Sequence, residues 1–127
     1  MPLTPDQVAD GQLQAYNAKD IDTFMTYWAT DARIYQHPDT LLASGAAEIR
    51  ARHVTRFQEP NLHGHLVQRL CVGNTVVDRE VVTRTFPEGT GTLDVLAIYE
   101  VTGERITRAW FVTGAPVLDK LDDTHAG

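Results

Sequence analysis

The chain has 127 residues, of which 43% are hydrophobic, and its 11 basic and 17 acidic side chains give a formal net charge of −6. This length predicts a single domain, residues 1–127, that can bury about two-thirds of its unfolded surface. The negative charge argues against a nucleic-acid partner and against an anionic membrane surface. We expect a soluble cytoplasmic protein, because the chain has one cysteine, Cys71, and shows neither a signal peptide nor an apolar run of bilayer length.

Two helical patterns open the chain. Residues 5–18 are predicted to be helical, because Thr4 can act as N-cap, Pro5 suits the first helical position and Gln7 can complete a capping box. Asp20 is the expected N-cap of a second helix. The apolar residues of this second helix recur at helical spacing and are predicted to be core: Ile21, Phe24, Met25 and Trp28.

A short strand with a polar tip, residues 31–38, is predicted next. Its alternating side chains form two sets that face opposite sides: Arg33, Tyr35 and His37, and Ala32, Ile34 and Gln36. Pro38 ends the strand because it has no N–H to donate. If His37 points inward, its imidazole is a candidate general base.

A third helix, residues 46–58, places His53 on its buried line, where a core or rim histidine is the usual interpretation. The period then changes to two, and strands are expected at residues 62–72, 75–86, 92–101 and 104–113. In the second of these strands, four side chains share one face: Val76, Asp78, Glu80 and Val82. Residues 114–127 are expected to be a fraying tail, which leaves a core of residues 5–113. This order predicts an α+β domain.

Several short motifs between residues 7 and 113 occur in a recognisable order: Tyr16-Asn17-Ala18-Lys19-Asp20-Ile21, Trp28-Ala29-Thr30-Asp31-Ala32, Ser44-Gly45, Leu93-Asp94-Val95 and Trp110-Phe111. Their order and spacing resemble the NTF2-like, or SnoaL-like, superfamily, which includes ketosteroid isomerases and polyketide cyclases. The resemblance implies a cone in which three N-terminal helices pack on a strongly curved, mostly antiparallel sheet around an apolar cavity. It also implies a homodimer through the outer sheet face.

The chain departs from the ketosteroid isomerases at the positions that carry their chemistry. His37 before Pro38 stands where they have a proton-shuttling aspartate before a proline. Gln12 aligns with their oxyanion-binding tyrosine, with Tyr16 one turn later, and Ala97 aligns with their oxyanion-binding acid. Loss of one such donor costs on the order of a hundredfold in rate, so we do not expect steroid isomerase activity.

Two functional classes stay open on the sequence alone. The first is an enzyme that acts on a small apolar molecule by proton transfer, as an isomerase, cyclase, dehydratase or hydrolase, with His37 as base and Asp78 or Glu80 as its carboxylate partner. The second is a non-catalytic dimer that binds a metabolite or mediates association. Asp78 could instead be solvated or paired with an arginine.

Several residues are predicted to line the ligand cavity, although aromatic residues at these spacings are also typical of a core: Tyr16, Trp28, Tyr35, Ala97, Tyr99 and Phe111. His63 and His65 share a strand face and could contribute to a zinc site, but this spacing is common by chance. We therefore expect no metal and no cofactor.

Overall fold

The computed structural model describes residues 2–119 of the chain. Its elements follow in the order α1 (Pro5–Ala18), α2 (Ile21–Thr26), β1 (Trp28–Gln36), β2 (Thr40–Ser44), α3 (Ala46–Arg56), β3 (His63–Val72), β4 (Thr75–Phe86), β5 (Gly89–Thr102), β6 (Arg105–Thr113) and β7 (Val117–Leu118). The described strands form one sheet in the order β2-β1-β6-β5-β4-β3, and β7 pairs with β5. Only β1 and β6 are parallel within it.

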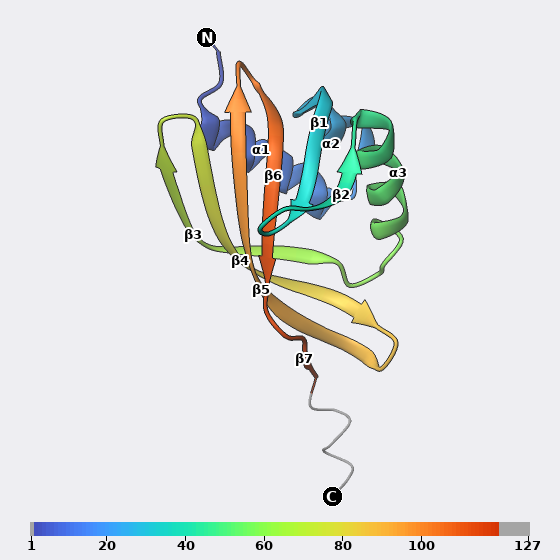
Figure 1. The fold of residues 1–127 in the computed structure, drawn as a ribbon. Coiled ribbons are helices and arrows are strands. Elements are labelled where there is room, and N and C mark those ends of the chain that lie inside the picture. Colours follow the sequence, from blue (N-terminus) through green and yellow to red (C-terminus); the bar gives the residue numbers. More distant parts are fainter. Residues whose placement is uncertain (1, 120–127) are drawn as a thin grey trace, which may run out of the picture.

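The sheet is strongly bent, and the helices lie on its concave side (Figure 1). Helix α1 crosses the sheet and contacts β3, β4, β5 and β6, while α3 packs beside β1 and β2. The predicted α+β class, with three helices against a curved and mostly antiparallel sheet, is confirmed. Among residues 2–119, no helix is both long enough and apolar enough to cross a membrane.

Local signals set the starts of the first two helices. The backbone N–H of Thr4 donates to Oε1 of Gln7 at 3.0 Å, which is one half of a capping box. Lys19 adopts a left-handed conformation with φ 58° and ends α1. The carboxylate of Asp20 then accepts the Thr23 N–H at 3.2 Å and begins α2, as its position predicted.

Helix α2 is shorter than the sequence predicted. It ends at Thr26, and Trp28 begins β1 instead of closing the helix. The backbone explains this difference, because Trp28 is paired with Ile106 of β6 and the Ile106 N–H donates to the Tyr27 carbonyl at 2.7 Å. Trp28 is still core, since its side chain is only 2% exposed and its ring lies 5.8 Å from that of Phe24.

Two strands fall where the sequence predicted none. Residues 40–44 return along β1 as β2, with Ile34 opposite Ala43. In the predicted tail, Val117 and Leu118 pair with Thr92 and Gly91 of β5. Residues 120–127 of that tail lie outside the described residues.

A β-bulge in β3 changes which of its side chains face inward. The register with β4 shifts between Leu66 and Gln68, so that Arg69 lies opposite Asp78. Simple alternation predicted Leu70 on the same face as Leu62, but Leu62 is 3% exposed and Leu70 is 58% exposed. The bulge therefore brings a charged side chain, Arg69, towards the helices.

Candidate functional site

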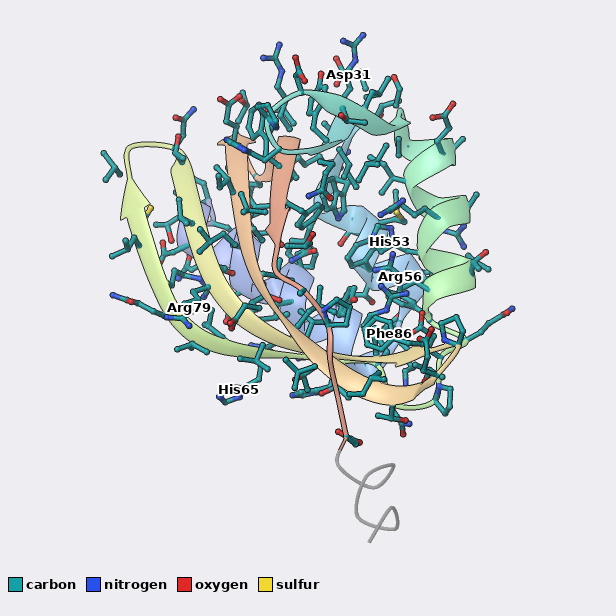
Figure 2. The ribbon with its side chains drawn as sticks, turned by 60° about the horizontal axis from the view of Figure 1, so that its bottom comes forward. Asp31, His53, Arg56, His65, Arg79 and Phe86 are labelled. Carbon is teal, nitrogen blue, oxygen red and sulfur yellow. The ribbon has the colours of Figure 1, made fainter. Side chains whose placement is uncertain are left out.

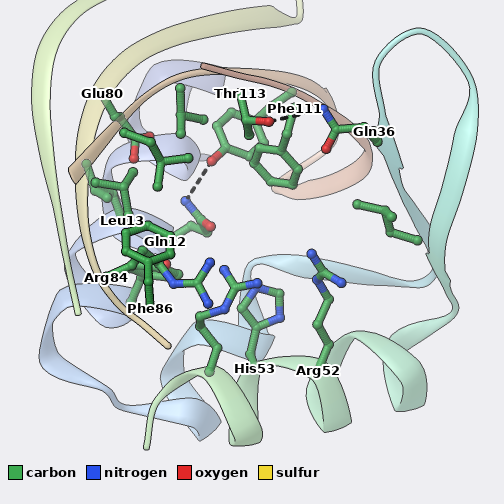
Figure 3. A pocket seen from close by; sticks show the side chains of 17 residues that line it. Gln12, Leu13, Gln36, Arg52, His53, Glu80, Arg84, Phe86, Phe111 and Thr113 are labelled. Atoms are coloured by element: carbon green, nitrogen blue, oxygen red, sulfur yellow. Dashed lines mark hydrogen bonds between the residues drawn. The ribbon is translucent and has the colours of Figure 1, made fainter. Parts of the chain in front are cut away.

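A cavity of about 270 Å³ opens between α1, α3 and the inner face of the sheet (Figure 3). Its lining residues come from helices and strands that are far apart in the sequence: Gln12, Leu13, Tyr16, Gln36, Leu42, Arg52, His53, Arg56, Glu80, Val82, Arg84, Phe86, Leu93, Val95, Tyr99, Phe111 and Thr113. Aliphatic and aromatic side chains make up much of the wall. The charged groups are Glu80 on the sheet side and arginines of α3 and β4.

Glu80 is the buried acid of this cavity, with only 5% of the residue exposed. It lies on β4, where Val76, Asp78, Glu80 and Val82 share one face, as the sequence predicted, and the structure shows that this face is the inner one. Burial, together with the charge of the neighbouring Asp78, raises the pKa of Glu80 to about 7, although Arg69 opposes both effects. A carboxyl with such a pKa can both donate and accept a proton near neutral pH.

Gly64 has no side chain, and the Glu80 carboxyl occupies the space where a side chain would begin. A Cβ at position 64 would lie 2.9 Å from Oε1 of Glu80 and 3.1 Å from Cδ1 of Leu13. The amide of Asn17 fixes this part of β3, because it donates to the Gly64 carbonyl at 2.9 Å and accepts the Gly64 N–H at 2.8 Å. Glu80 is thus positioned by a strand that is tied to α1.

Asp78 does not line the cavity. It is fully buried and accepts two hydrogen bonds from Arg69, at 2.7 Å to Oδ1 and 2.9 Å to Oδ2. Arg69 also donates to Asp10 of α1 at 3.1 Å. Both Asp78 oxygens are engaged, so its contacts are those of a structural ion pair, and its partner is Arg69 and not His37.

His37 is exposed and also lies outside the cavity lining. Its backbone N–H donates to the Phe111 carbonyl of β6 at 2.9 Å, which fixes the end of β1 against the sheet. The covered face of β1 carries Ala32 and Ile34, both fully buried, and Gln36 of the same set lines the cavity. The predicted inward imidazole is therefore wrong, because alternation directs His37 to the opposite face.

Of the residues predicted to line the cavity, Tyr16, Tyr99 and Phe111 do so. Trp28 and Ala97 belong to the core and do not reach the cavity lining. Tyr35 shares the outer face with His37, and its ring stacks on Trp110 with 5.7 Å between centroids. Three of the six predicted lining residues are thus misplaced by their strand face or their depth.

Tyr99 and Gln12 form a polar pair on the cavity wall. The Nε2 group of Gln12 donates to the Tyr99 hydroxyl and to the Ala9 carbonyl, each at 3.4 Å. Because the Tyr99 oxygen accepts this bond, its own hydrogen stays available to a ligand. Burial raises the pKa of Tyr99 well above its usual value, and Glu80 adds to that rise, so the hydroxyl stays protonated.

His53 is 6% exposed and packs against the rings of Phe24, Tyr16 and Phe57. Burial lowers the pKa of His53 to about 4, so the imidazole is neutral at neutral pH. Its Nδ1 lies 2.8 Å from the Ile49 carbonyl, which can only accept, and therefore Nδ1 carries the proton. This confirms a buried core or rim histidine.

Three arginines lie together at the α3 side of the cavity: Arg52, Arg56 and Arg84. Figure 2 shows His53 and Arg56 on the side of α3 that faces the sheet, and His65 pointing away from the molecule. The Arg84 guanidinium forms a bidentate pair with Glu59, with Nη2 2.6 Å from Oε2 and Nε 2.9 Å from Oε1. Arg56 lies 3.8 Å from the same carboxylate.

The sequence interpretation missed this arginine cluster. Arg84 continues the even-numbered inner face of β4 beyond Val82, so the alternation did contain a signal for it. Arg52 and Arg56 are four residues apart on α3, which places them on one line of the helix. That spacing alone does not distinguish a cavity wall from a solvated face.

Among the described residues, no group of three or more His, Cys, Asp or Glu side chains could hold a metal ion. His63 and His65 are both exposed on β3.

The bent sheet, the three covering helices and the enclosed cavity define an α+β cone protein of the NTF2-like class. The sequence model of the SnoaL-like domain matches residues 9–109, so the chain belongs to the SnoaL-like family. No curated protein matched the chain.

Solved structures share the fold. An uncharacterised cystatin-fold protein from Novosphingobium aromaticivorans is 28% identical, with a TM-score of 0.81 over 87% of this chain and 98% of that one. A candidate SnoaL-like polyketide cyclase from Shewanella denitrificans is 15% identical, with a TM-score of 0.74 over 87% of this chain and 90% of that one. IdmH from Streptomyces antibioticus, a candidate polyketide cyclase, is 19% identical, with a TM-score of 0.74 over 87% and 92%. The last two likenesses concern the fold alone.

Proposed function

We propose that this protein binds a small, largely apolar molecule in its cavity and transfers a proton to or from it, as an isomerase, cyclase, dehydratase or hydrolase. The observation that carries the proposal is Glu80, a buried carboxyl that lines the cavity and has a pKa raised to about 7. Among residues 2–119, no group donates a hydrogen bond to its side chain, so the carboxyl is free for a ligand. Glu80 replaces His37 as the candidate base.

Tyr99 supplies the second component of this chemistry. A proton removed next to a carbonyl leaves negative charge on the carbonyl oxygen, and a hydrogen-bond donor already in place stabilises that charge. The Tyr99 hydroxyl is such a donor, because Gln12 occupies its oxygen and leaves its hydrogen available. This arrangement offers one hydroxyl donor where ketosteroid isomerases have two donors.

The experiment is solvent exchange on carbon. Small cyclic ketones such as cyclohexanone and tetralone are incubated with the protein in deuterium oxide, and loss of the α-proton signal is followed by proton NMR. Removal of a general base typically costs about 10²–10⁴-fold, so Glu80→Gln should lose exchange by this factor. His37→Gln is the matched control, because it removes the outer-face imidazole and should leave the exchange rate unchanged.

Two results would contradict the proposal. If Glu80→Gln exchanges as fast as the wild type, the carboxyl has no catalytic role. If the wild type binds the ketones but exchanges none of them, the cavity serves for binding only, which is the non-catalytic class that the sequence left open.

We further propose that the protein is a homodimer through the outer sheet face. Direct strand pairing places a row of apolar side chains across this face, from β3 through β4, β5 and β6 to β1: Leu70, Val77, Ile98, Trp110 and Tyr35. Leu96 and Val112 are paired beside this row and are 38% and 37% exposed. Leu70 is exposed and the other four residues of the row are partly exposed, and contiguous apolar surface of this kind is typical of an association site.

Sedimentation tests the dimer. The wild type should sediment at twice the chain mass of 14.1 kDa, and Leu96→Lys should convert it to monomer. Val72→Lys is the control, since Val72 is 81% exposed at the end of β3 and outside the row. A wild type that is monomeric at micromolar concentration would contradict the proposal.

A further inference from the structure

The charges around the cavity are not balanced. Three guanidinium groups line its α3 side, and Glu59 is the carboxylate that pairs with two of them, Arg84 and Arg56. Glu59 holds Arg84 in a bidentate pair and also accepts the Thr85 N–H at 3.1 Å, so little of its charge remains for Arg56 at 3.8 Å. In a chain with a net charge of −6, this side of the cavity is locally cationic.

Arg52 is the guanidinium without compensation. Among the described residues, none forms an ion pair or a side-chain hydrogen bond with Arg52, although it is partly buried. Its neighbour Arg50 differs, because Arg50 is 46% exposed and its Nη2 lies 2.6 Å from Asp22. Burial lowers the pKa of Arg52, and the charges of Arg56 and Arg84 lower it further, so an anion beside Arg52 would relieve both effects.

From this we infer that the cavity ligand carries a carboxylate that binds to Arg52, with Arg56 beside Arg52. This inference rests on the proposed function and names its substrate class. The cavity volume of about 270 Å³ is slightly below the roughly 300–1,000 Å³ of sites for drug-sized ligands, so the acid is small. Leu42, Phe86 and Phe111 offer an apolar wall for the rest of the molecule.

The charge balance favours a carboxylate over a phosphate. Arg84 is neutralised by Glu59, and Arg56 is partly neutralised, so the uncompensated charge is close to that of one guanidinium. A carboxylate carries one negative charge and matches the planar fork of a single arginine. A phosphate monoester carries close to two charges at neutral pH and would leave an excess in a partly buried site.

This assignment also orients the ligand. Figure 3 shows Arg52 and Glu80 on opposite sides of the cavity. A carboxylate held by Arg52 therefore directs the other end of a small acid towards Glu80 and the Tyr99 hydroxyl. Binding energy from the remote carboxylate would then position the reacting carbon.

Isothermal titration calorimetry at low salt and pH 6 tests the inference with three probes. Hydrocinnamate carries the carboxylate, hydrocinnamamide is its neutral counterpart, and phenyl phosphate is the more highly charged alternative. A charge-assisted hydrogen bond is worth about tenfold or more in affinity, so hydrocinnamate should bind at least that much more tightly than the amide. Arg52→Gln should remove this preference and leave amide binding unchanged.

Arg50→Gln is the matched control, since it removes the same charge from the same helix on the exposed side. It should change hydrocinnamate affinity by less than about twofold. Any one of four results would overturn the inference. These are equal affinity for acid and amide, tighter binding of phenyl phosphate, no detectable hydrocinnamate binding at millimolar concentration, and an equal loss of affinity in Arg50→Gln and Arg52→Gln.

Glu80→Gln separates this inference from the proposed function. It should keep the preference for hydrocinnamate over hydrocinnamamide, because Glu80 lies across the cavity from Arg52. A wild type that prefers hydrocinnamate to the amide but exchanges no ketone would refute the proton-transfer chemistry and keep the ligand class. A wild type that exchanges the ketones, loses that exchange in Glu80→Gln and binds acid and amide equally would refute the ligand class and keep the proton-transfer chemistry.

Discussion

Replacing Glu80 by glutamine should change the stability of the folded protein in a pH-dependent way. The pKa of this carboxyl is about 7 in the folded protein and 4.5 in an ordinary solvated glutamate. Below pH 4.5 the group is protonated in both states and has no effect. As the pH rises from 4.5 through 7, the unfolded chain loses this proton first, so the wild type becomes less stable.

The size of the effect follows from the pKa difference. Each unit of pKa is worth about 1.4 kcal/mol, so the rise from 4.5 to about 7 costs the folded protein about 3 kcal/mol above pH 7. Glutamine has a similar volume and no titration. The unfolding free energy of the variant should therefore increase relative to that of the wild type as the pH rises, and the difference should approach about 3 kcal/mol at pH 8. The charged neighbours Asp78 and Arg69 are retained in both proteins.

Urea denaturation of both proteins at several pH values between 4.5 and 8 measures the difference in unfolding free energy. The slope with urea should be the same for both, because the surface exposed on unfolding is unchanged. Glu88→Gln is the control for loss of one carboxylate, since Glu88 is exposed between β4 and β5. A difference between Glu80→Gln and the wild type that stays constant with pH would refute the raised pKa and, with it, the proton-transfer role.

Two further substitutions test how Glu80 is held. Gly64→Ala places a Cβ 2.9 Å from Oε1 of Glu80 and should displace the carboxyl. The ketone exchange rate should therefore fall, while the far-ultraviolet circular dichroism stays unchanged. Exchange at the wild-type rate would show that the carboxyl position is not critical. Arg69→Met leaves the buried Asp78 without its partner, so urea denaturation should show an unfolding free energy lower by about 3–5 kcal/mol. Arg79→Met removes an exposed pair with Asp94 and should lower the unfolding free energy by less than about 1 kcal/mol. Equal losses in the two arginine variants would mean that burial of the ion pair contributes nothing.

Much of the fold was predictable from local patterns. The cap at Asp20 and the alternation of residues 76–82 depend on neighbouring residues, and the structure has both. The same alternation placed Glu80 on one face with Val76 and Val82, but it did not decide which face is covered. Local rules failed at Trp28, because pairing with β6, which is distant in sequence, prevailed over the helical spacing.

The site depended on information that no single segment contains. Alternation gave two faces of β1, but the position of the helices decides which one is covered, and that left His37 outside. Arg69 faces inward because of a β-bulge in β3, and the sequence of β3 does not predict that bulge. Arg52 became a candidate only when the cavity was located beside α3.

Two buried groups of the cavity change the stability of the protein with pH in opposite directions. Neutral His53 has a pKa lowered to about 4, so the protein loses stability as the pH falls from 6.5 to 4, since the unfolded chain takes up a proton first. Glu80 makes the protein lose stability as the pH rises from 4.5 to about 7. Between these limits the two slopes largely cancel, and both side chains are mostly uncharged near pH 6. Arg52 then provides the uncompensated charge of the cavity, which is why an anionic group on the ligand would find its partner there and not at Glu80.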